Sequence, residues 1–352
     1  MRLRFRLTKP MAWMIYGANG YTGQLIAELA NTHGEKPILA GRNAAKVRAL
    51  AEKLGLPWRA FALDRPDLRD IRLVLHCAGP FSATSRPMVD ACLAARAHYL
   101  DITGEVEVFE SVFARDAEAR ERDVVLLPGT GFDVVPSDCL AASLKQRLPS
   151  ATKLELAFAS LGRASPGTLK TSIEAVPRGG LVRRGGKLVR VPPAFEVREI
   201  PFADKRRTAM SIPWGDLATA WRSTKIPDIT VFVAAKRSAI RAARLTRFTA
   251  PLLGLAPVQL FLKSRIERNV KGPGPEERAR GGAQFWGSAS EGSRSVEMTM
   301  SIPEGYTFTA TAAVECAKRV LGSGIHPGAW TPSLAFGAGF AASLPGVRVG
   351  VR

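Results

Sequence analysis

The sequence predicts an α/β protein in which a doubly wound parallel sheet is followed by a second, α+β domain. Two observations predict this fold class. Short apolar runs alternate with segments of helical periodicity over the first 130 residues, and a strand-rich pattern replaces them from residue 153 onward. A length of 352 residues also exceeds that of one ordinary core. We therefore expect one domain at 1–130, a second at 131–324, and a segment at 325–352 that returns to the first.

The first domain is expected to contain six strands linked by crossovers. The predicted strands are residues 12–16, 36–40, 58–63, 71–77, 98–102 and 124–127. The predicted helices are residues 24–31, 43–54, 86–96 and 105–122. The segment at 71–77 is a Leu/Val/Ile run, which is typical of a strand covered on both faces. Right-handed crossovers between such strands predict a parallel sheet in the order 3-2-1-4-5-6.

The second domain is expected to be a sheet covered on one face that supplies the wall of a substrate cleft. Its clearest strand patterns are residues 154–159 and 295–302, and its clearest helices are 167–176 and 307–321.

A glycine-rich turn joins the first strand to the first helix. It reads Gly17, Ala18, Asn19, Gly20, Tyr21, Thr22 and Gly23. Gly17 permits the tight turn, Gly20 lets a pyrophosphate approach the backbone, and Gly23 lets the helix pack close to the sheet. The spacing is one residue wider than the G-x-G-x-x-G fingerprint. At the head of a βαβ array, the run predicts a Rossmann dinucleotide-binding loop over an ordinary turn.

The end of the second strand indicates which dinucleotide is bound. Arg42 and Asn43 stand where an acidic residue would bind the ribose 2′-hydroxyl of NAD. An arginine suits a 2′-phosphate, so NADP(H) is the expected cofactor, although Arg42 could instead cap a helix or face water.

Two later segments are expected to touch the same cofactor. Asp64 follows the third strand, near the expected adenine. The fourth strand ends beneath the expected nicotinamide ribose, with Cys77, Ala78, Gly79, Pro80 and Phe81. Either segment could also be an ordinary loop.

The candidate catalytic residues are Asp101, at the end of the fifth strand, and Tyr99 beside it. Asp101 could instead only cap the following helix. Gly104, Phe132 and Asp133 are expected to line the substrate cleft, with Asp133 lying behind Asp101. The Tyr-x-x-x-Lys pair of short-chain dehydrogenases is absent, as are the G-x-S-x-G, Walker A and H-E-x-x-H motifs. The scattered cysteines and histidines predict neither a metal site nor a disulfide scaffold, which favours a cytoplasmic protein.

Seven different short motifs are distributed along the chain. They lie at residues 15–23, 77–81, 99–105, 131–138, 272–278, 305–306 and 331–333. In these motifs the sequence resembles the saccharopine dehydrogenase-like oxidoreductases, and within them the bacterial trans-acting enoyl reductases. The resemblance implies a nicotinamide cofactor between two lobes and reduction of an enoyl, acyl or other hydrophobic substrate, with donors near Gly79 or Gly104 steadying an enolate. Two alternatives stay open. One is an imine reductase that holds carboxylates with Arg163, Arg178 or Arg183, and the other is a non-catalytic NADP-binding protein that docks at a membrane.

The net charge of +19 is concentrated in one region. Residues 236–271 carry nine basic side chains and one acidic one around an apolar run at 248–262. Such a segment suits peripheral contact with an anionic membrane at the inner face, or an ordinary buried helix with a solvated side. It is too short to span a bilayer. Nucleic-acid binding is not expected, since no interleaving of aromatic and basic residues resembles a known motif. A homodimer is left open.

Overall fold

The computed structural model describes residues 12–160, 162–322 and 324–351. Within these residues, seven strands form a parallel sheet in the order β15-β6-β5-β4-β1-β2-β3. The strands are β1 (Ala12–Tyr16), β2 (Ile38–Gly41), β3 (Trp58–Ala60), β4 (Ile71–His76), β5 (His98–Asp101), β6 (Val125–Leu127) and β15 (Gly328–Ala329). The predicted order 3-2-1-4-5-6 is confirmed, and β15 extends the sheet beyond β6.

The helices between these strands are α1 (Tyr21–Thr32), α2 (Ala44–Leu54), α3 (Phe81–Ala95), α4 (Val106–Phe113) and α5 (Asp116–Glu121). Two of them differ from the prediction. The expected helix at 105–122 is divided into α4 and α5, and α3 begins at Phe81 rather than at residue 86. Pro87 lies inside α3 and disguises its start in the sequence. The Glu105 carboxylate accepts the backbone N–H groups of Phe81 and Ser82, which caps the earlier start.

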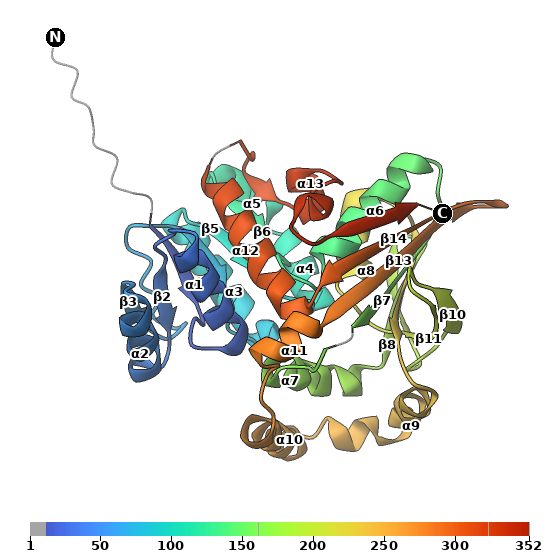
Figure 1. Ribbon diagram of the computed structural model, residues 1–352, viewed down its shortest axis with the longest axis horizontal. Coiled ribbons are helices and arrows are strands. Elements are labelled where there is room, and N and C mark those ends of the chain that lie inside the picture. The colour runs from blue at the N-terminus through green and yellow to red at the C-terminus, as the bar shows by residue number, and fades with distance from the viewer. Residues whose placement is uncertain (1–11, 161, 323, 352) are drawn as a thin grey trace, which may run out of the picture.

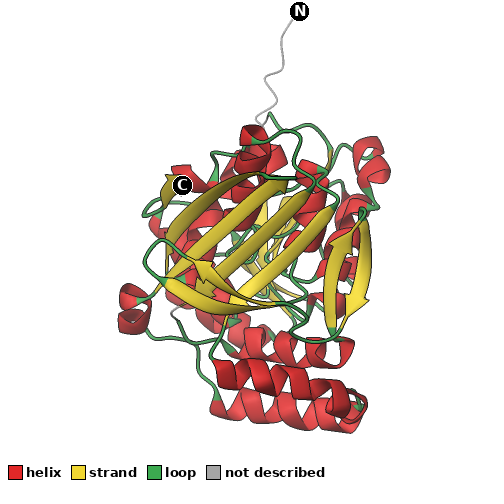
Figure 2. Cartoon of the chain, turned by 90° about the vertical axis from the view of Figure 1, so that its right-hand side faces the viewer, coloured by secondary structure: helices red, strands yellow, loops and turns green. Residues whose placement is uncertain are grey.

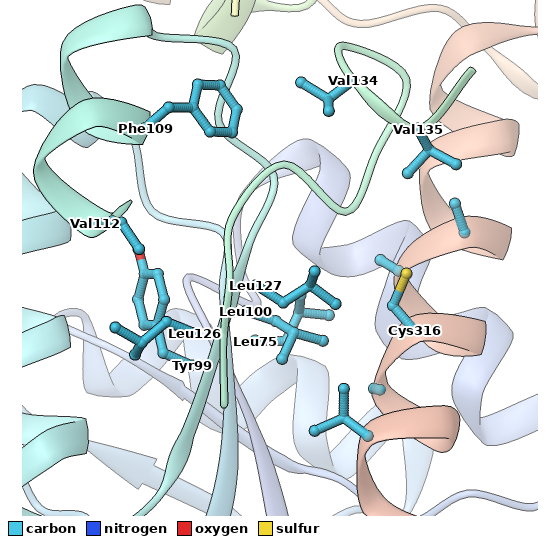
Figure 3. Close-up of a cluster of buried hydrophobic side chains, with 14 of the residues drawn as sticks. Leu75, Tyr99, Leu100, Phe109, Val112, Leu126, Leu127, Val134, Val135 and Cys316 are labelled. Carbon is cyan, nitrogen blue, oxygen red and sulfur yellow. The ribbon is translucent and has the colours of Figure 1, made fainter. Parts of the chain in front are cut away.

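A helix from the second half of the chain completes the first lobe. α12 (Gly305–Leu321) packs beside α1 and against β4 and β5 (Figure 1). Figure 3 shows the resulting core: Leu75, Leu100 and Leu127 project from the sheet toward Cys316 of α12. Tyr99 and Leu126 lie on the opposite side, toward α4. The predicted boundary at residue 324 therefore places in the second domain a helix that covers the first sheet.

A second sheet has the strand order β10-β11-β12-β7-β13-β14-β16, and the β8–β9 hairpin joins it through β12. Its strands are β7 (Lys153–Ser160), β8 (Gly180–Arg184), β9 (Lys187–Val191), β10 (Val197–Pro201), β11 (Arg206–Ser211), β12 (Asp228–Ala234), β13 (Gly282–Glu291), β14 (Arg294–Pro303) and β16 (Arg348–Val351). Leu154, Leu156 and Phe158 alternate toward the main core. Figure 2 shows the broad opposite face of this sheet turned toward the viewer, as expected for a sheet covered on one face.

The remaining helices are α6 (Val135–Arg147), α7 (Pro166–Ala175), η1 (Val176–Arg178), α8 (Asp216–Thr224), α9 (Arg237–Leu253), α10 (Ala256–Asn269), α11 (Pro275–Arg280), α13 (Pro332–Phe336) and η2 (Ala341–Ser343). α6 and α8 cover the inner face of the second sheet. The C-terminal segment contributes one strand to each sheet: β15 pairs with β6 of the first sheet, and β16 pairs with β14 of the second. The segment at 325–352, expected to return to the first domain, is thus shared between the two sheets. No helix among the described residues is long and apolar enough to cross a membrane.

Candidate cofactor site and substrate cleft

The glycine run forms a turn that only glycine can make. Gly17 has a φ of +86°, and a Cβ there would come within 2.7 Å of the Ala78 backbone nitrogen. A Cβ on Gly23 would collide with the carbonyl oxygen of Gly17, so the close approach of α1 to the turn also requires glycine. The Gly17 and Ala18 N–H groups donate to the carbonyl oxygen of Ala40 at the end of β2. The turn is thereby held at the carboxyl ends of the central strands.

The first turn of α1 is suited to an anion. Gly20 is its N-cap and provides no side-chain cap, and the turn contains no acidic residue. Its backbone N–H groups and the positive end of the helix dipole are therefore available to a negative ligand. Asn19 and Gly20 are exposed, while Tyr21 and Thr22 are half-buried. This arrangement fits the pyrophosphate of a dinucleotide.

Arg278 approaches the same helix end from the second half of the chain. Its guanidinium donates to the Tyr21 hydroxyl at 3.1 Å and to the Pro273 carbonyl at 2.9 Å. The Tyr21 hydroxyl itself donates to Pro273, and its ring meets Tyr306 edge to face. Among the described residues no carboxylate pairs with Arg278, so its charge is not neutralised locally. An open depression beside this contact is lined by Arg278, Gly281, Pro303, Glu304 and Thr307.

The residues expected at the adenosine end lie on the surface. Arg42 is exposed and forms no hydrogen bond or ion pair with another described residue, so it is free to meet a phosphate. Asn43 is the N-cap of α2, and its side chain accepts the Lys46 N–H at 3.0 Å. Asp64 is also exposed. Burial raises the pKa of the Tyr16 hydroxyl at the end of β1, and the charges of Arg42 and Asp64 also act on it, which places both near this strand end.

The segment after β4 lies beside the glycine turn, and the two N–H groups that follow it at the start of α3 are already bound. Cys77 and Ala78 are half-buried and Gly79 is exposed. The first two N–H groups of α3 point at the Glu105 carboxylate, at 2.9 and 3.0 Å. Glu105 thus binds the N–H groups of Phe81 and Ser82, whereas those of Ala78 and Gly79 have no hydrogen-bond acceptor among the described residues.

Asp101 and Tyr99, the predicted catalytic pair, have no exposed surface. The Tyr99 hydroxyl donates to Asp101 Oδ2 at 2.7 Å, and Asp101 Oδ1 accepts the N–H groups of Thr103 and Gly129. Burial raises the pKa of Asp101 to about 6, against the lowering effect of these donors. The pair ties the loop after β5 to the loop after β6. Asp101 therefore joins these two loops and does not cap the following helix, whose N-cap is Glu105.

Asp133 is the carboxyl group that faces the junction of the two lobes. It is half-buried, and among the described residues no group donates a hydrogen bond to its carboxylate. Burial raises its pKa to about 7, and the Glu105 carboxylate contributes to the increase. Gly104 packs directly against it. The expected order is thus reversed, since Asp101 lies behind the surface and Asp133 lies at it.

Aromatic side chains adjoin Asp133. The Trp214 indole N–H donates to the Asp133 carbonyl oxygen at 2.8 Å, which fixes the loop. Phe132 packs on Phe158 and Phe285 of the second sheet, with ring centroids 5.8 and 5.4 Å apart. Three of the predicted cleft residues, Gly104, Phe132 and Asp133, are thereby brought together on one largely apolar surface.

The arginines considered for a dicarboxylate substrate are all engaged elsewhere. Arg163 pairs with Glu277, Arg178 with Glu107 and Arg183 with Glu110. Arg183 is also buried and donates to the backbone carbonyl groups of Leu217 and Gly186.

Two residues of the site were not predicted, namely Glu105 and Arg278. Each lies in a motif that carries the family resemblance, but a glutamate after a strand and an arginine in a short helix have no local pattern that reveals a long-range partner. Their roles depend on contacts with residues 24 and 257 positions away.

Comparison with known proteins agrees with this geometry. Residues 13–127 match the family model of the saccharopine dehydrogenase NADP binding domain. The chain is 28% identical over 160 residues to a mouse saccharopine dehydrogenase-like oxidoreductase, covering 37% of the chain and 36% of that protein. It is 29% identical over 183 residues to a trans-acting enoyl reductase of Mycobacterium ulcerans, covering 46% and 44%. The chain thus spans less than half the length of these relatives.

The whole fold has a counterpart among solved structures. Saccharopine dehydrogenase (L-Glu forming) from Saccharomyces cerevisiae superposes with a TM-score of 0.66, covering 97% of this chain and 100% of that one, at 11% identity. At this identity the match shows the fold alone. The expected doubly wound sheet with a second sheet domain and the expected cofactor class, NADP(H), are confirmed at the level of the domain family.

Proposed function

We propose that this chain, whose residues 13–127 form a saccharopine dehydrogenase NADP-binding domain, is an NADP(H)-dependent reductase of an enoyl, acyl or other hydrophobic substrate. The observation that carries the proposal is Asp133, a half-buried carboxyl group next to Phe132 that accepts no hydrogen bond from the described residues and whose pKa is raised by burial to about 7. Reductions of this kind need a proton as well as a hydride. When bound, the nicotinamide would supply the hydride.

The chain's own residues fit the cofactor at both of its ends. The uncapped first turn of α1 and the turn at Gly17 would hold the pyrophosphate. Arg42, exposed and without a partner, would bind the 2′-phosphate. Arg278 would add positive charge near the pyrophosphate from the other lobe.

Asp133 has the properties of a general acid at neutral pH. Since its pKa is about 7, a large fraction of its carboxyl groups is protonated there, and the proton faces the junction. Burial is the main cause of that raised pKa, and the charge of Glu105, which accepts two N–H groups of α3, adds to it. Asp101 and Tyr99 act as positioning residues, because they hold the loops on both sides of Asp133.

The surroundings favour an apolar substrate over an amino-acid imine. A dicarboxylate would need free arginines near Asp133, and the three candidates already pair with glutamates. Phe132, half-buried beside Asp133, instead offers apolar surface, and the buried Phe158 and Phe285 support its ring. The likeness to a trans-acting enoyl reductase points in the same direction.

The test is substrate-dependent oxidation of NADPH by the purified protein, with a panel of 2-enoyl thioesters and a panel of amino-acid imines. We expect turnover with the thioesters, at a rate that falls as pH rises through about 7. Asp133→Asn should lower kcat by about 10²-fold or more and remove this pH dependence. Asp70→Asn, at an exposed loop position, is the matched control.

Turnover of imines but not thioesters would move the assignment to imine reduction. NADPH binding without turnover of any substrate would favour a non-catalytic NADP-binding protein. An Asp133→Asn variant with an unchanged kcat and pH profile would remove Asp133 from the chemistry.

A further inference from the structure

Helices α9 and α10 expose an unusual number of large apolar side chains. Figure 1 places the two helices at the lower edge of the molecule, outside α7. Six large apolar side chains of these helices and of the linker between them are 51–68% exposed. They are Leu245, Phe248, Leu252, Leu255, Leu260 and Phe261. We call these six residues, with Arg237, Arg241, Arg244 and Arg247, the α9–α10 surface. Contiguous exposed apolar residues on one surface indicate a binding partner.

The apolar and basic residues of α9 follow one another along a single stripe. Arg237, Arg241 and Arg244 occupy its first half, and Leu245, Phe248 and Leu252 continue it at the helical spacing. All six are exposed. α9 packs on η1, with Gly254 at its C-terminal end against Pro177, and its buried Ile240 lies beside β10 and β11. The stripe is exposed along its length, and its arginine half borders the groove beside these two strands.

The basic residues of this stripe are not neutralised by the protein. Among the described residues, no carboxylate forms an ion pair with any of the four arginines of α9. Arg237, Arg241 and Arg244 line a groove between α9 and the strands β10 and β11, together with Arg198. Arg198 pairs with Glu155, and the groove also contains Glu199, whose carboxylate accepts the Thr208 hydroxyl, so the three arginines of α9 leave the groove with a net positive charge. Arg247 stacks on Phe248, with its guanidinium carbon 4.4 Å from the ring centroid.

We propose that the α9–α10 surface docks on an anionic lipid bilayer, with α9 lying in the plane of the interface. The apolar half of the stripe would enter the boundary between headgroups and acyl chains, and the arginines would bind lipid phosphates. A helix with apolar and arginine-rich segments on the same exposed side matches both layers of such an interface.

The charge distribution favours lipid over a second copy of the chain. Two copies joined through this surface would bring the unpaired arginines of both α9 helices together, and like charges across an interface are costly. An anionic bilayer supplies the opposite charge to every arginine at once. The protein as a whole, with a net charge of +19, is attracted to the same surface.

Docking in this way would place the lobe junction near the lipid. α10 packs on α7, and Lys263 of α10 pairs with Glu174 of α7. Burial raises the pKa of Glu105 and the charge of Glu174 adds to the increase, so α7 lies near Glu105. The proposal does not depend on catalysis, since binding to lipid needs neither cofactor nor substrate.

The experiment is co-sedimentation of the full chain with vesicles of phosphatidylcholine alone, or of equimolar phosphatidylcholine and phosphatidylglycerol, without nucleotide. We expect binding to the mixed vesicles at least tenfold tighter than to phosphatidylcholine, and weaker binding at high salt. Arg241→Glu with Arg244→Glu should weaken binding at least tenfold. Phe248→Ser with Leu252→Ser should do the same, because it removes the inserted apolar side chains.

Matched controls carry the same changes elsewhere. Arg48→Glu with Lys53→Glu reverses two charges on α2, and Phe195→Ser removes an exposed aromatic side chain that lies outside α9 and α10. Both should bind mixed vesicles as the unchanged protein does. Thermal unfolding of each variant verifies that it is folded. The comparison of the two vesicle types uses the unchanged protein, so it tests the proposal even if a variant fails to fold.

Three results would overturn the proposal. The first is absence of binding to the mixed vesicles, and the second is binding that the α9 pairs alter no more than their controls do. The third is a dimer in sedimentation that dissociates in the Phe248→Ser, Leu252→Ser variant while vesicles bind neither form, since a second copy would then cover the surface.

Discussion

Gly104 packs directly against the carboxyl group of Asp133: a Cβ added at Gly104 would come within 2.8 Å of Asp133 Oδ2 and 3.1 Å of its Cγ. Gly104→Ala should therefore displace the carboxyl group without touching the glycine turn. We expect kcat to fall by about tenfold or more, because a small misplacement of a reacting group is costly, while NADPH affinity stays the same. Steady-state kinetics and nucleotide titration measure the two effects. Gly339→Ala, where a Cβ meets open space, is the control; equal effects of the two changes would contradict the prediction.

Arg42 is expected to decide between the two nicotinamide cofactors. Arg42→Ala should weaken NADPH binding by about 10- to 100-fold, the value of a charge-assisted hydrogen bond, and leave NADH binding unchanged. Tryptophan fluorescence titration with each nucleotide measures the difference. Arg48→Ala on α2, the helix that follows Arg42, removes an exposed arginine whose only ion pair among the described residues is with Glu52, so it should change neither affinity. A parallel loss of NADH binding would place Arg42 outside the 2′-phosphate site.

A side chain at Gly17 would meet two obstacles, a left-handed backbone and a lack of space. Comparison with a second glycine distinguishes the effects of these two obstacles. Gly34 also has a positive φ, of +79°, but a Cβ there meets nothing. Gly34→Ala should lower the free energy of unfolding by about 1 kcal/mol, the cost of left-handed backbone alone. Gly17→Ala must also displace the backbone at Ala78, so we expect a larger loss of stability together with loss of NADPH binding. Urea unfolding and nucleotide titration provide the two measurements; equal losses at both positions would be inconsistent with the collision.

Glu105 should tune the pH dependence of the reaction. Its negative charge adds to burial in raising the pKa of Asp133. Glu105→Gln removes that charge, so the pH above which activity is lost should move downward from about 7. The pH profile of kcat measures this shift. Glu107→Gln, an exposed neighbour that pairs with Arg178, should leave the profile in place. A pH profile that moves upward, or does not move, would show that the charge of Glu105 does not raise the pKa of the group that controls kcat.

Asp133 should also make stability depend on pH. Its pKa is about 7 in the folded protein and 3.8 in a free side chain, so the folded state binds more protons between these values. The contribution to stability is complete below the unfolded pKa and is lost as pH rises through about 7. Relative to the unchanged protein, Asp133→Asn should gain on the order of 1 kcal/mol at pH 8 compared with pH 5, a value discounted for solvent screening because Asp133 is only half-buried. Chemical unfolding at both pH values tests this. The buried Asp101 has a pKa of about 6, so it also makes the free energy of unfolding fall as pH rises. The Asp133→Asn variant retains this contribution.

Much of the first lobe follows from local patterns in the sequence. The strand order and the glycine turn were predictable, because strand and helix periodicity and the conformational needs of Gly17 act over a few residues. The start of α3 was not, because it depends on Glu105, a capping group 24 residues away. The role of α12 was also hidden, since its apolar face suits either lobe and only packing beside α1 assigns it to the first.

The candidate site divides in the same way. By itself the sequence determined that a dinucleotide would meet a glycine turn and that an exposed arginine would follow β2, because both features belong to one βαβ unit. Only the tertiary structure decided which carboxyl group faces the junction. Asp101 and Asp133 follow neighbouring strands and look alike as letters, but Asp101 accepts three hydrogen bonds in a closed interior, whereas Asp133 has none and lies at the surface between two sheets. Burial and long-range partners set the pKa of a carboxyl group, and neither is encoded in the residues next to it.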